Sequence, residues 1–105
     1  MKQTERLLLP NGDEPFKRWI DSLELKSRAK IYQYIDRVAS GGAKKNIKSV
    51  GEGIFEIKIN YGPGFRVYFG ELDNTIILLL IGGDKDSQEK DIKIAKYYWK
   101  NYVQK

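Results

Sequence analysis

The chain contains neither cysteine nor histidine among its 105 residues. Without cysteine it can form no disulfide and no cysteine nucleophile. Without histidine it lacks Ser-His-Asp triads and the usual zinc ligand sets. Any acid–base chemistry must therefore come from Lys, Arg, Tyr, Asp or Glu. The sequence thus offers none of the usual signatures of a catalytic or metal site.

Long apolar runs are also missing. No stretch approaches the roughly 18 apolar residues that a membrane helix needs. The longest run, Ile76–Ile81, suits a buried strand. The N-terminal residues Met1–Arg6 lack the apolar region of a signal peptide, so we expect a cytoplasmic protein without a membrane partner. With 41% hydrophobic and 31% charged residues, we expect one globular domain over residues 1–105.

Positive charge is what the chain has in excess. Nineteen Lys and Arg residues against fourteen Asp and Glu give a formal net charge of +5, and the pI is near 9.4. Such a balance favours an anionic partner, either nucleic acid or an acidic protein segment. Charge alone does not decide between the two, because many small domains are basic.

Hydrophobic periodicity and turn residues predict the order of elements. We expect a strand over 3–9, two helices over about 15–23 and 26–39 that form an α-hairpin, and a basic connection over 43–53. Two strands around a Gly-Pro turn follow, at 55–59 and 65–69, and a third at 75–81. Asp86 with Glu89 resembles a capping box that opens a last helix. The order βααβββα predicts an α+β fold with a small, antiparallel-rich sheet, an N-terminal α-hairpin and a C-terminal helix.

The central hairpin sorts its side chains by alternation. This pattern predicts a sheet that is packed on one face and carries polar groups on the other. The packed face would hold Phe55, Ile57, Ile59, Phe65, Val67 and Phe69. The polar face would hold Glu56, Lys58, Arg66 and Tyr68.

Lys58 and Arg66 are the most informative pair on that face. Adjacent antiparallel strands hold side chains of one face within about 5–8 Å, so the two cations would repel unless something lies between them. Glu56 could neutralise them in a surface cluster. Alternatively they could clamp a phosphate, with Lys85 reaching in from the loop after the third strand. A lysine among other cations can act as a general base, and Glu56 is the rival base.

Two further motifs have simpler interpretations. Tyr61-Gly62-Pro63-Gly64 lacks the Lys-Ser/Thr of a phosphate-binding loop and predicts a tight hairpin turn. The last helix carries a lysine stripe, which is either a solvated face or a contact for ribosomal RNA or an acidic partner. The stripe consists of Lys90, Lys93, Lys96 and Lys100.

Several runs in this order resemble one protein family. Residues 51–58 and 61–69 resemble the RelE/ParE toxin superfamily, and residues 78–85 and 90–96 are similar to its phage-related HigB branch, the addiction-module killer proteins. The resemblance covers nearly the whole chain. It implies a RelE-like microbial RNase fold and the toxin of a type II toxin–antitoxin pair. RelE-like members cut mRNA in the ribosomal A site through attack of a 2′-hydroxyl on the adjacent phosphate.

The resemblance also implies a ribosome-dependent, metal-independent endoribonuclease that inhibits translation and needs no cofactor. By position, Lys58 matches a catalytic sheet lysine, Arg66 the arginine of a Gly-Tyr/Phe-Arg motif, and Lys85 a basic residue after the last strand. We expect Arg66 and Lys85 to stabilise transition-state charge and Lys58 to remove a proton or bind phosphate. RelE's second sheet lysine aligns with Glu56, and Asp91 falls near the place of its C-terminal tyrosine. The candidates for acid or base are Glu56, Tyr61 and Tyr68; those for RNA or ribosome contact are Lys44, Lys45, Lys48, Lys93 and Lys96.

The expected partners follow from the same resemblance. They are a cognate helix-turn-helix antitoxin of the HigA type, the ribosome and mRNA, with DNA contacted only through the antitoxin. An acidic stretch of that antitoxin would fit the basic face. Two alternatives stay open at this point, a ParE-like inhibitor of DNA gyrase and an inactive module that only binds its antitoxin.

Overall fold

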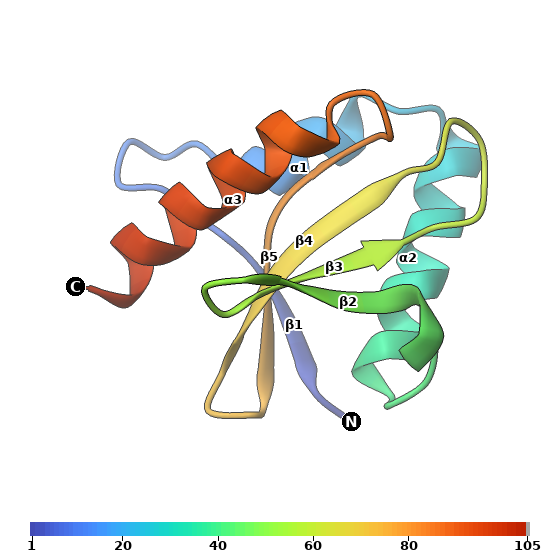
Figure 1. Cartoon of the computed structure of the whole chain (residues 1–105). Coiled ribbons are helices and arrows are strands. Elements are labelled where there is room, and N and C mark those ends of the chain that lie inside the picture. The colour runs from blue at the N-terminus through green and yellow to red at the C-terminus, as the bar shows by residue number, and fades with distance from the viewer. Residues whose placement is uncertain (105) are drawn as a thin grey trace.

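The computed structural model describes residues 1–104, which form a five-stranded sheet with helices on both faces (Figure 1). The sheet has the order β1-β5-β4-β3-β2; β1 runs parallel to β5, and the other neighbours are antiparallel. The expected α+β class is confirmed. The strands are β1 (Gln3–Arg6), β2 (Ile47–Gly51), β3 (Ile54–Lys58), β4 (Arg66–Leu72) and β5 (Ile76–Gly83). The helices are α1 (Pro15–Asp21), α2 (Leu25–Ala39), α3 (Gln88–Val103) and the short 3-10 helix η1 (Lys44–Asn46). None of these helices is long and apolar enough to cross a membrane.

The first core lies between the α1–α2 pair and one face of the sheet. Its residues from β3 and β4 are those that the alternation predicted, because period two places them on the same side, and Ile77 and Leu79 of β5 join them. Ile57, Val67 and Phe69 meet Phe16 of α1 and Ile35 of α2, and all are at most 2% exposed. The rest of the predicted face, Phe55, Ile59 and Phe65, belongs to the same cluster.

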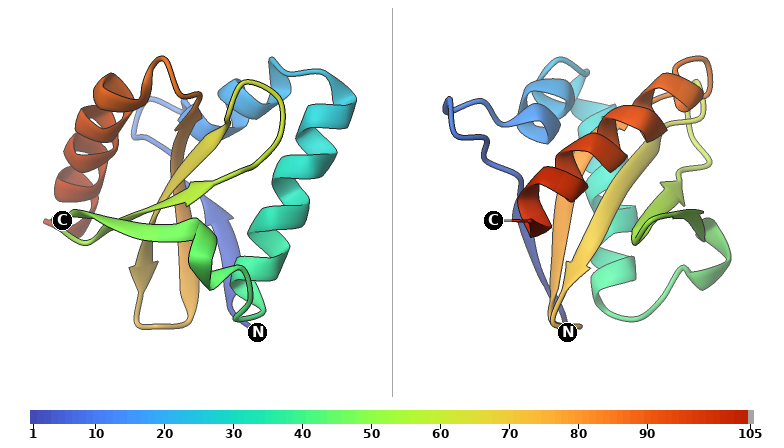
Figure 2. Two further views of the ribbon diagram at one scale, coloured as in Figure 1. Left: turned by 45° about the vertical axis from the view of Figure 1, so that its right-hand side comes forward. Right: turned by 60° about the vertical axis from the view of Figure 1, so that its left-hand side comes forward.

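The second face of the sheet is not the open polar surface that the alternation predicts. Helix α3 packs across it, and Figure 2 shows α2 and α3 on opposite sides of the sheet. The apolar stripe of α3 needs a partner surface, and Ile54, Leu78 and Leu80 provide it in a second core. Of the four predicted polar residues only Lys58 remains exposed; Glu56, Arg66 and Tyr68 are 2%, 7% and 0% exposed.

Strand β2 lies within the segment expected to be only a basic connection. It pairs with β3, with Ile47 opposite Ile57 and Lys48 opposite Glu56. A five-residue edge strand with two apolar residues gives little alternation to detect. The turn that follows is made possible by positive φ angles at Gly51, Glu52 and Gly53 (96°, 56° and 84°). This hairpin places the lysines of the segment beside the central strands.

Several element boundaries also differ from expectation. Helix α1 ends at Asp21 and not at Leu23, and β5 continues beyond Ile81 to Gly83. Strand β1 ends at Arg6 and not at Leu9. Helix α3 begins at Gln88 with Ser87 as its N-cap, so the capping box expected from Asp86 and Glu89 does not form. Instead, Asp84 organises the preceding turn, since its Oδ1 accepts the backbone N–H groups of Asp86 (2.9 Å) and Ser87 (3.2 Å).

Close contacts between tryptophan and glycine fix the helices on the sheet. The ring of Trp99 in α3 lies so near Gly70 of β4 that a Cβ there would overlap it, and Trp19 of α1 lies in the same way against Gly82 of β5. Interior packing at this density leaves no room for an added methyl group. The two glycines therefore determine how closely each helix layer approaches the sheet.

We expect Gly70→Ala to lower the free energy of unfolding by about 1–3 kcal/mol, because the new methyl group would displace the Trp99 ring. Chemical denaturation measures this cost. In a Trp99→Ala background the same change should cost much less, since the space is then vacant. An equal cost in both backgrounds would show that the Trp99 contact is not the cause.

Candidate active site

Cationic side chains gather in a hollow where β2, β3 and β4 meet η1. The hollow has a volume of about 260 Å³. The strand register builds it, because Lys48 lies opposite Glu56 and Lys58 opposite Arg66. We call it the basic hollow, and it is lined by Lys45, Asn46, Ile47, Lys48, Glu56, Lys58 and Arg66. Four cations thus surround one carboxylate.

Arg66 lies at the inner side of this hollow and is held by neighbours. Its Nη1 donates to the carbonyl oxygen of Gly64 (2.6 Å), and its Nε lies 3.9 Å from Oε1 of Glu56. This hydrogen bond, the nearby carboxylate and burial favour one orientation of the planar guanidinium, although Nε itself has no hydrogen-bond partner among the described residues. Arg66 is therefore a fixed positive charge and not a mobile surface group.

Lys85 approaches Arg66 from the loop after β5. A Cβ placed on Gly64 would lie 3.1 Å from Nη1 of Arg66 and 3.6 Å from Cβ of Lys85. Nη1 of Arg66 and Cβ of Lys85 therefore both lie beside Gly64, whose φ of +78° is readily adopted only by glycine. Lys85 is exposed and does not line the basic hollow itself. The structure thus brings Lys58, Arg66 and Lys85 into one neighbourhood from three separate segments.

Glu56 is the buried counter-ion of this site. Its Oε2 accepts a hydrogen bond from Nε2 of Gln88 in α3 (2.8 Å), while its Oε1 lies 3.9 Å from both Lys48 Nζ and Arg66 Nε. A carboxylate that is 2% exposed and has three partners holds the cations around it. This position does not fit the expected role of Glu56 as an acid or base toward a substrate.

The two tyrosines expected as acid or base also lie away from the hollow's surface. Tyr68 is fully buried under α3; burial, and next the charge of Glu56, raise the pKa of its phenol above the ordinary value. Tyr61 packs on the first core, with Lys30 Nζ 5.9 Å from its ring centroid. The structure therefore places neither tyrosine where it would meet a substrate in the hollow.

The predicted RNA-contacting lysines divide into two groups. Lys45 and Lys48 line the basic hollow, and Lys44 is exposed beside them on η1. Lys93 and Lys96 lie apart on α3, and Lys96 Nζ is 3.5 Å from Oε2 of Glu52 in the β2–β3 turn. Only the first group belongs to the same surface as Lys58.

Two supporting residues were missed at the level of sequence. Asn46 donates from Nδ2 to the carbonyl oxygen of Lys58 (3.0 Å) and holds η1 against the end of β3. Gln88, in the first turn of α3, donates a hydrogen bond to Glu56. Neither has a sequence signal, because each acts only after the β2–β3 hairpin and α3 have taken their places.

Asp91 of α3 is a second buried carboxylate near this site, and its side chain packs against the end of β5. It is 5% exposed, Ser87 Oγ donates to it, and a Cβ on Gly83 would overlap it. Burial raises the pKa of Asp91 above its ordinary value; the Ser87 hydrogen bond and Lys90 oppose this, and Asp84 adds to it. Compared with the unfolded chain, the folded state therefore shifts this carboxyl group toward its protonated form.

Because the pKa of Asp91 is raised in the folded state, ionisation of Asp91 lowers the free energy of unfolding. This loss begins as pH rises above 3.8, the ordinary pKa of the group. We expect Asp91→Asn to gain stability over the wild type as pH rises from below 3.8 to neutral, because asparagine has no charge to bury. Denaturant titrations across this pH range measure the difference. The exposed Asp36→Asn is the matched control. A difference that does not change with pH would contradict the explanation.

Comparison with known proteins finds a family and a relative that this chain matches. The family model "Phage derived protein Gp49-like (DUF891)" matches residues 18–100, which include all the residues of the basic hollow and Lys85. An uncharacterized protein of Haemophilus influenzae is 45% identical over 82 residues, which is 77% of this chain and 82% of that protein.

A solved structure shares the fold. It is the intact RelBE toxin–antitoxin complex of E. coli, matched with a TM-score of 0.61 and 15% identity over 80% of this chain and 96% of that one. At this identity the likeness shows the fold. Together with the family match it confirms the resemblance to RelE-like proteins that the sequence motifs carry. The chain belongs to the phage-derived Gp49-like proteins, a RelE/HigB-type toxin family.

Proposed function

We propose that this protein is the toxin of a type II toxin–antitoxin pair and that it cuts mRNA on translating ribosomes. The observation that carries the proposal is the basic hollow, where four cations from η1, β2, β3 and β4 surround a single buried carboxylate. Such an excess of positive charge in a concave site suits a phosphate backbone. Membership of the Gp49-like family and the RelE-like fold support the same conclusion.

The proposed reaction is an internal transesterification. The 2′-oxygen attacks the adjacent phosphorus, the bond to the 5′-oxygen breaks, and the products are a 2′,3′-cyclic phosphate and a 5′-hydroxyl. One proton leaves the 2′-hydroxyl and one reaches the leaving oxygen. Charge on the phosphate oxygens increases in the transition state, so fixed cations accelerate the step.

The positions of the three cations suggest their roles. Arg66 supplies fixed charge from the inner side of the hollow, because Glu56 and the Gly64 carbonyl already hold its guanidinium. Lys58 is exposed and lies directly opposite Arg66 in the β3–β4 ladder. There it reaches the attacked phosphate or the 2′-hydroxyl of the neighbouring ribose. Lys85 adds charge from the loop after β5. Lys44, Lys45 and Lys48 extend the contact along the RNA backbone.

The expected partner is an antitoxin, since the structurally similar E. coli protein is part of a toxin–antitoxin complex. We propose that it is of the HigA type, with a helix-turn-helix that makes the DNA contacts of the pair. The net charge of +5 suits an acidic segment of such a partner.

Replacement of the exposed cations tests the chemistry. We expect Lys58→Ala and Lys85→Ala each to lower mRNA cleavage by about 100- to 1,000-fold, because each removes charge next to the reacting phosphate. Mapping the 5′ ends of cellular mRNA after brief induction measures it. Lys26→Ala is the matched control, since Lys26 is an exposed lysine on α2, against the opposite face of the sheet. Intact mRNA in growth-arrested cells, with DNA gyrase stalled, would replace the proposal with ParE-like inhibition.

Arg66 requires a gentler substitution. Arg66→Ala would leave Glu56 buried without one of its partners and destabilise the fold by about 3–5 kcal/mol. Arg66→Lys keeps the charge but removes the planar guanidinium that donates to Gly64 and lies beside Glu56. We expect this variant to fold and to cleave at least about tenfold more slowly than the wild type. Undiminished cleavage would show that the fixed orientation of Arg66 is not needed.

A further inference from the structure

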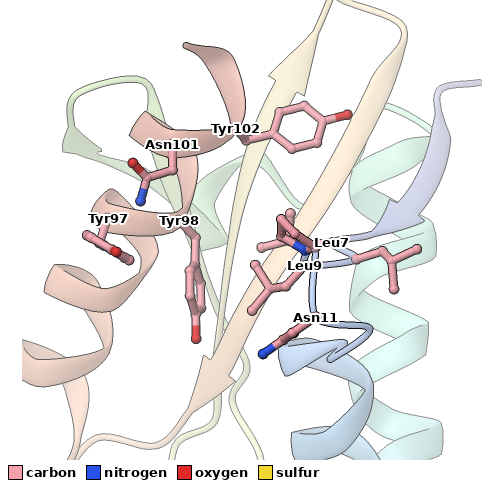
Figure 3. Close-up of a pocket in the computed structure, with 9 residues that line it drawn as sticks. Leu7, Leu9, Asn11, Tyr97, Tyr98, Asn101 and Tyr102 are labelled. Atoms are coloured by element: carbon pink, nitrogen blue, oxygen red, sulfur yellow. The ribbon is translucent and has the colours of Figure 1, made fainter. Parts of the chain in front are cut away.

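A second hollow lies away from the catalytic candidates, between residues 7–11 and the C-terminal half of α3 (Figure 3). It has a volume of about 450 Å³ and shares no residue with the basic hollow. Leu7 and Leu9 approach from the segment after β1, and Tyr98 and Tyr102 come from α3. We call it the tyrosine groove, and it is lined by Leu7, Leu8, Leu9, Pro10, Asn11, Tyr97, Tyr98, Asn101 and Tyr102.

The rim of the tyrosine groove is apolar and open to solvent. Leu9 and Tyr98 pack on the second core, so the floor of the groove is well supported. Leu8 and Tyr97, by contrast, are 59% and 66% exposed. Large exposed apolar side chains grouped around a concavity are typical of a protein–protein contact, and folding alone gives no reason to keep them there.

Positive charge borders the groove on the α3 side. Lys93 and Lys100 are four residues before and three residues after Tyr97, so both adjoin it on the helix surface. Both are exposed. Arg18, which lies near enough to interact with the charge of Tyr98, is paired with Asp13 at 2.8 Å and is thereby largely neutralised. The groove therefore fits an apolar segment that carries carboxylates on one side.

We propose that the tyrosine groove docks the antitoxin through an apolar segment whose flanking carboxylates meet Lys93 and Lys100. The proposal rests on the antitoxin named under Proposed function, but not on mRNA cleavage. A second copy of this chain fits less well, because each copy carries a net charge of +5 and would bring like charges together. RNA also fits less well, since none of the described residues that line the groove is a lysine or arginine that would hold its backbone.

Single substitutions at the rim test the docking site. The antitoxin is expected to be encoded by the gene next to that of this protein. We expect Leu8→Asn and Tyr97→Asn each to weaken binding of the purified product of this adjacent gene at least about tenfold, while cleavage of mRNA persists. Calorimetry measures the affinity, and circular dichroism checks the fold. Leu25→Asn is the matched control, because Leu25 is equally apolar, is 74% exposed and lies on α2. Lys100→Glu should also weaken binding, and the loss should shrink at high salt.

Unchanged affinity in both rim variants would overturn the docking site and leave the proposed toxin activity intact. Failure of the adjacent gene's product to bind the wild type would overturn docking and the antitoxin partner together. Self-association that Leu8→Asn abolishes would place a second copy in the groove instead. An absence of mRNA cleavage would overturn the proposed function alone. A photo-crosslinker at position 97 should label a partner peptide with apolar residues beside Asp or Glu; labelling of RNA would contradict the proposal.

Discussion

The candidate active site depends on the contacts that the buried carboxylate of Glu56 makes with its neighbours. This carboxylate is 2% exposed, and its partners come from three elements: Lys48 of β2, Arg66 of β4 and Gln88 of α3. Burial of a charge is costly unless opposite charges and hydrogen bonds compensate it. The edge hairpin, the central strand and the last helix must therefore be in place together. The same carboxylate orients Arg66, so the stability of the fold and the geometry of the site are linked.

Each face of the sheet contributes to a separate hydrophobic core, and this arrangement explains why the polar residues of the sheet differ in exposure. Helices α1 and α2 cover one face, and α3 covers the other only over the part that includes Ile54, Leu78 and Leu80. Tyr68 lies under the helix, whereas Lys58 and Lys48 lie beyond it toward the edge strand. A basic surface thus survives only where α3 leaves the sheet uncovered. The close contact of Trp99 with Gly70 helps to set that boundary.

The cations that we propose to bind RNA and the apolar groove that we propose to dock a partner occupy separate surfaces. The basic hollow draws on η1, β2, β3 and β4, while the tyrosine groove draws on residues 7–11 and α3. Arg66 and Glu56 are fixed by buried contacts, as suits a preorganised site. Leu8 and Tyr97 are exposed, as suits a contact that forms only with a partner. Substitutions in one surface are therefore expected to leave the other intact.

The sequence by itself determined the class of the fold, the face of Ile57, Val67 and Phe69, and the pairing of Lys58 with Arg66, because period-two alternation and a Gly-Pro turn are local signals. Its motifs also sufficed to indicate the family. Only the tertiary structure decided that β2 joins the sheet, that α3 buries Glu56 and Tyr68, and that Leu8 and Tyr97 line one groove. These outcomes depend on which surfaces pack together across long sequence separations, and no local pattern encodes the burial or the partners that result.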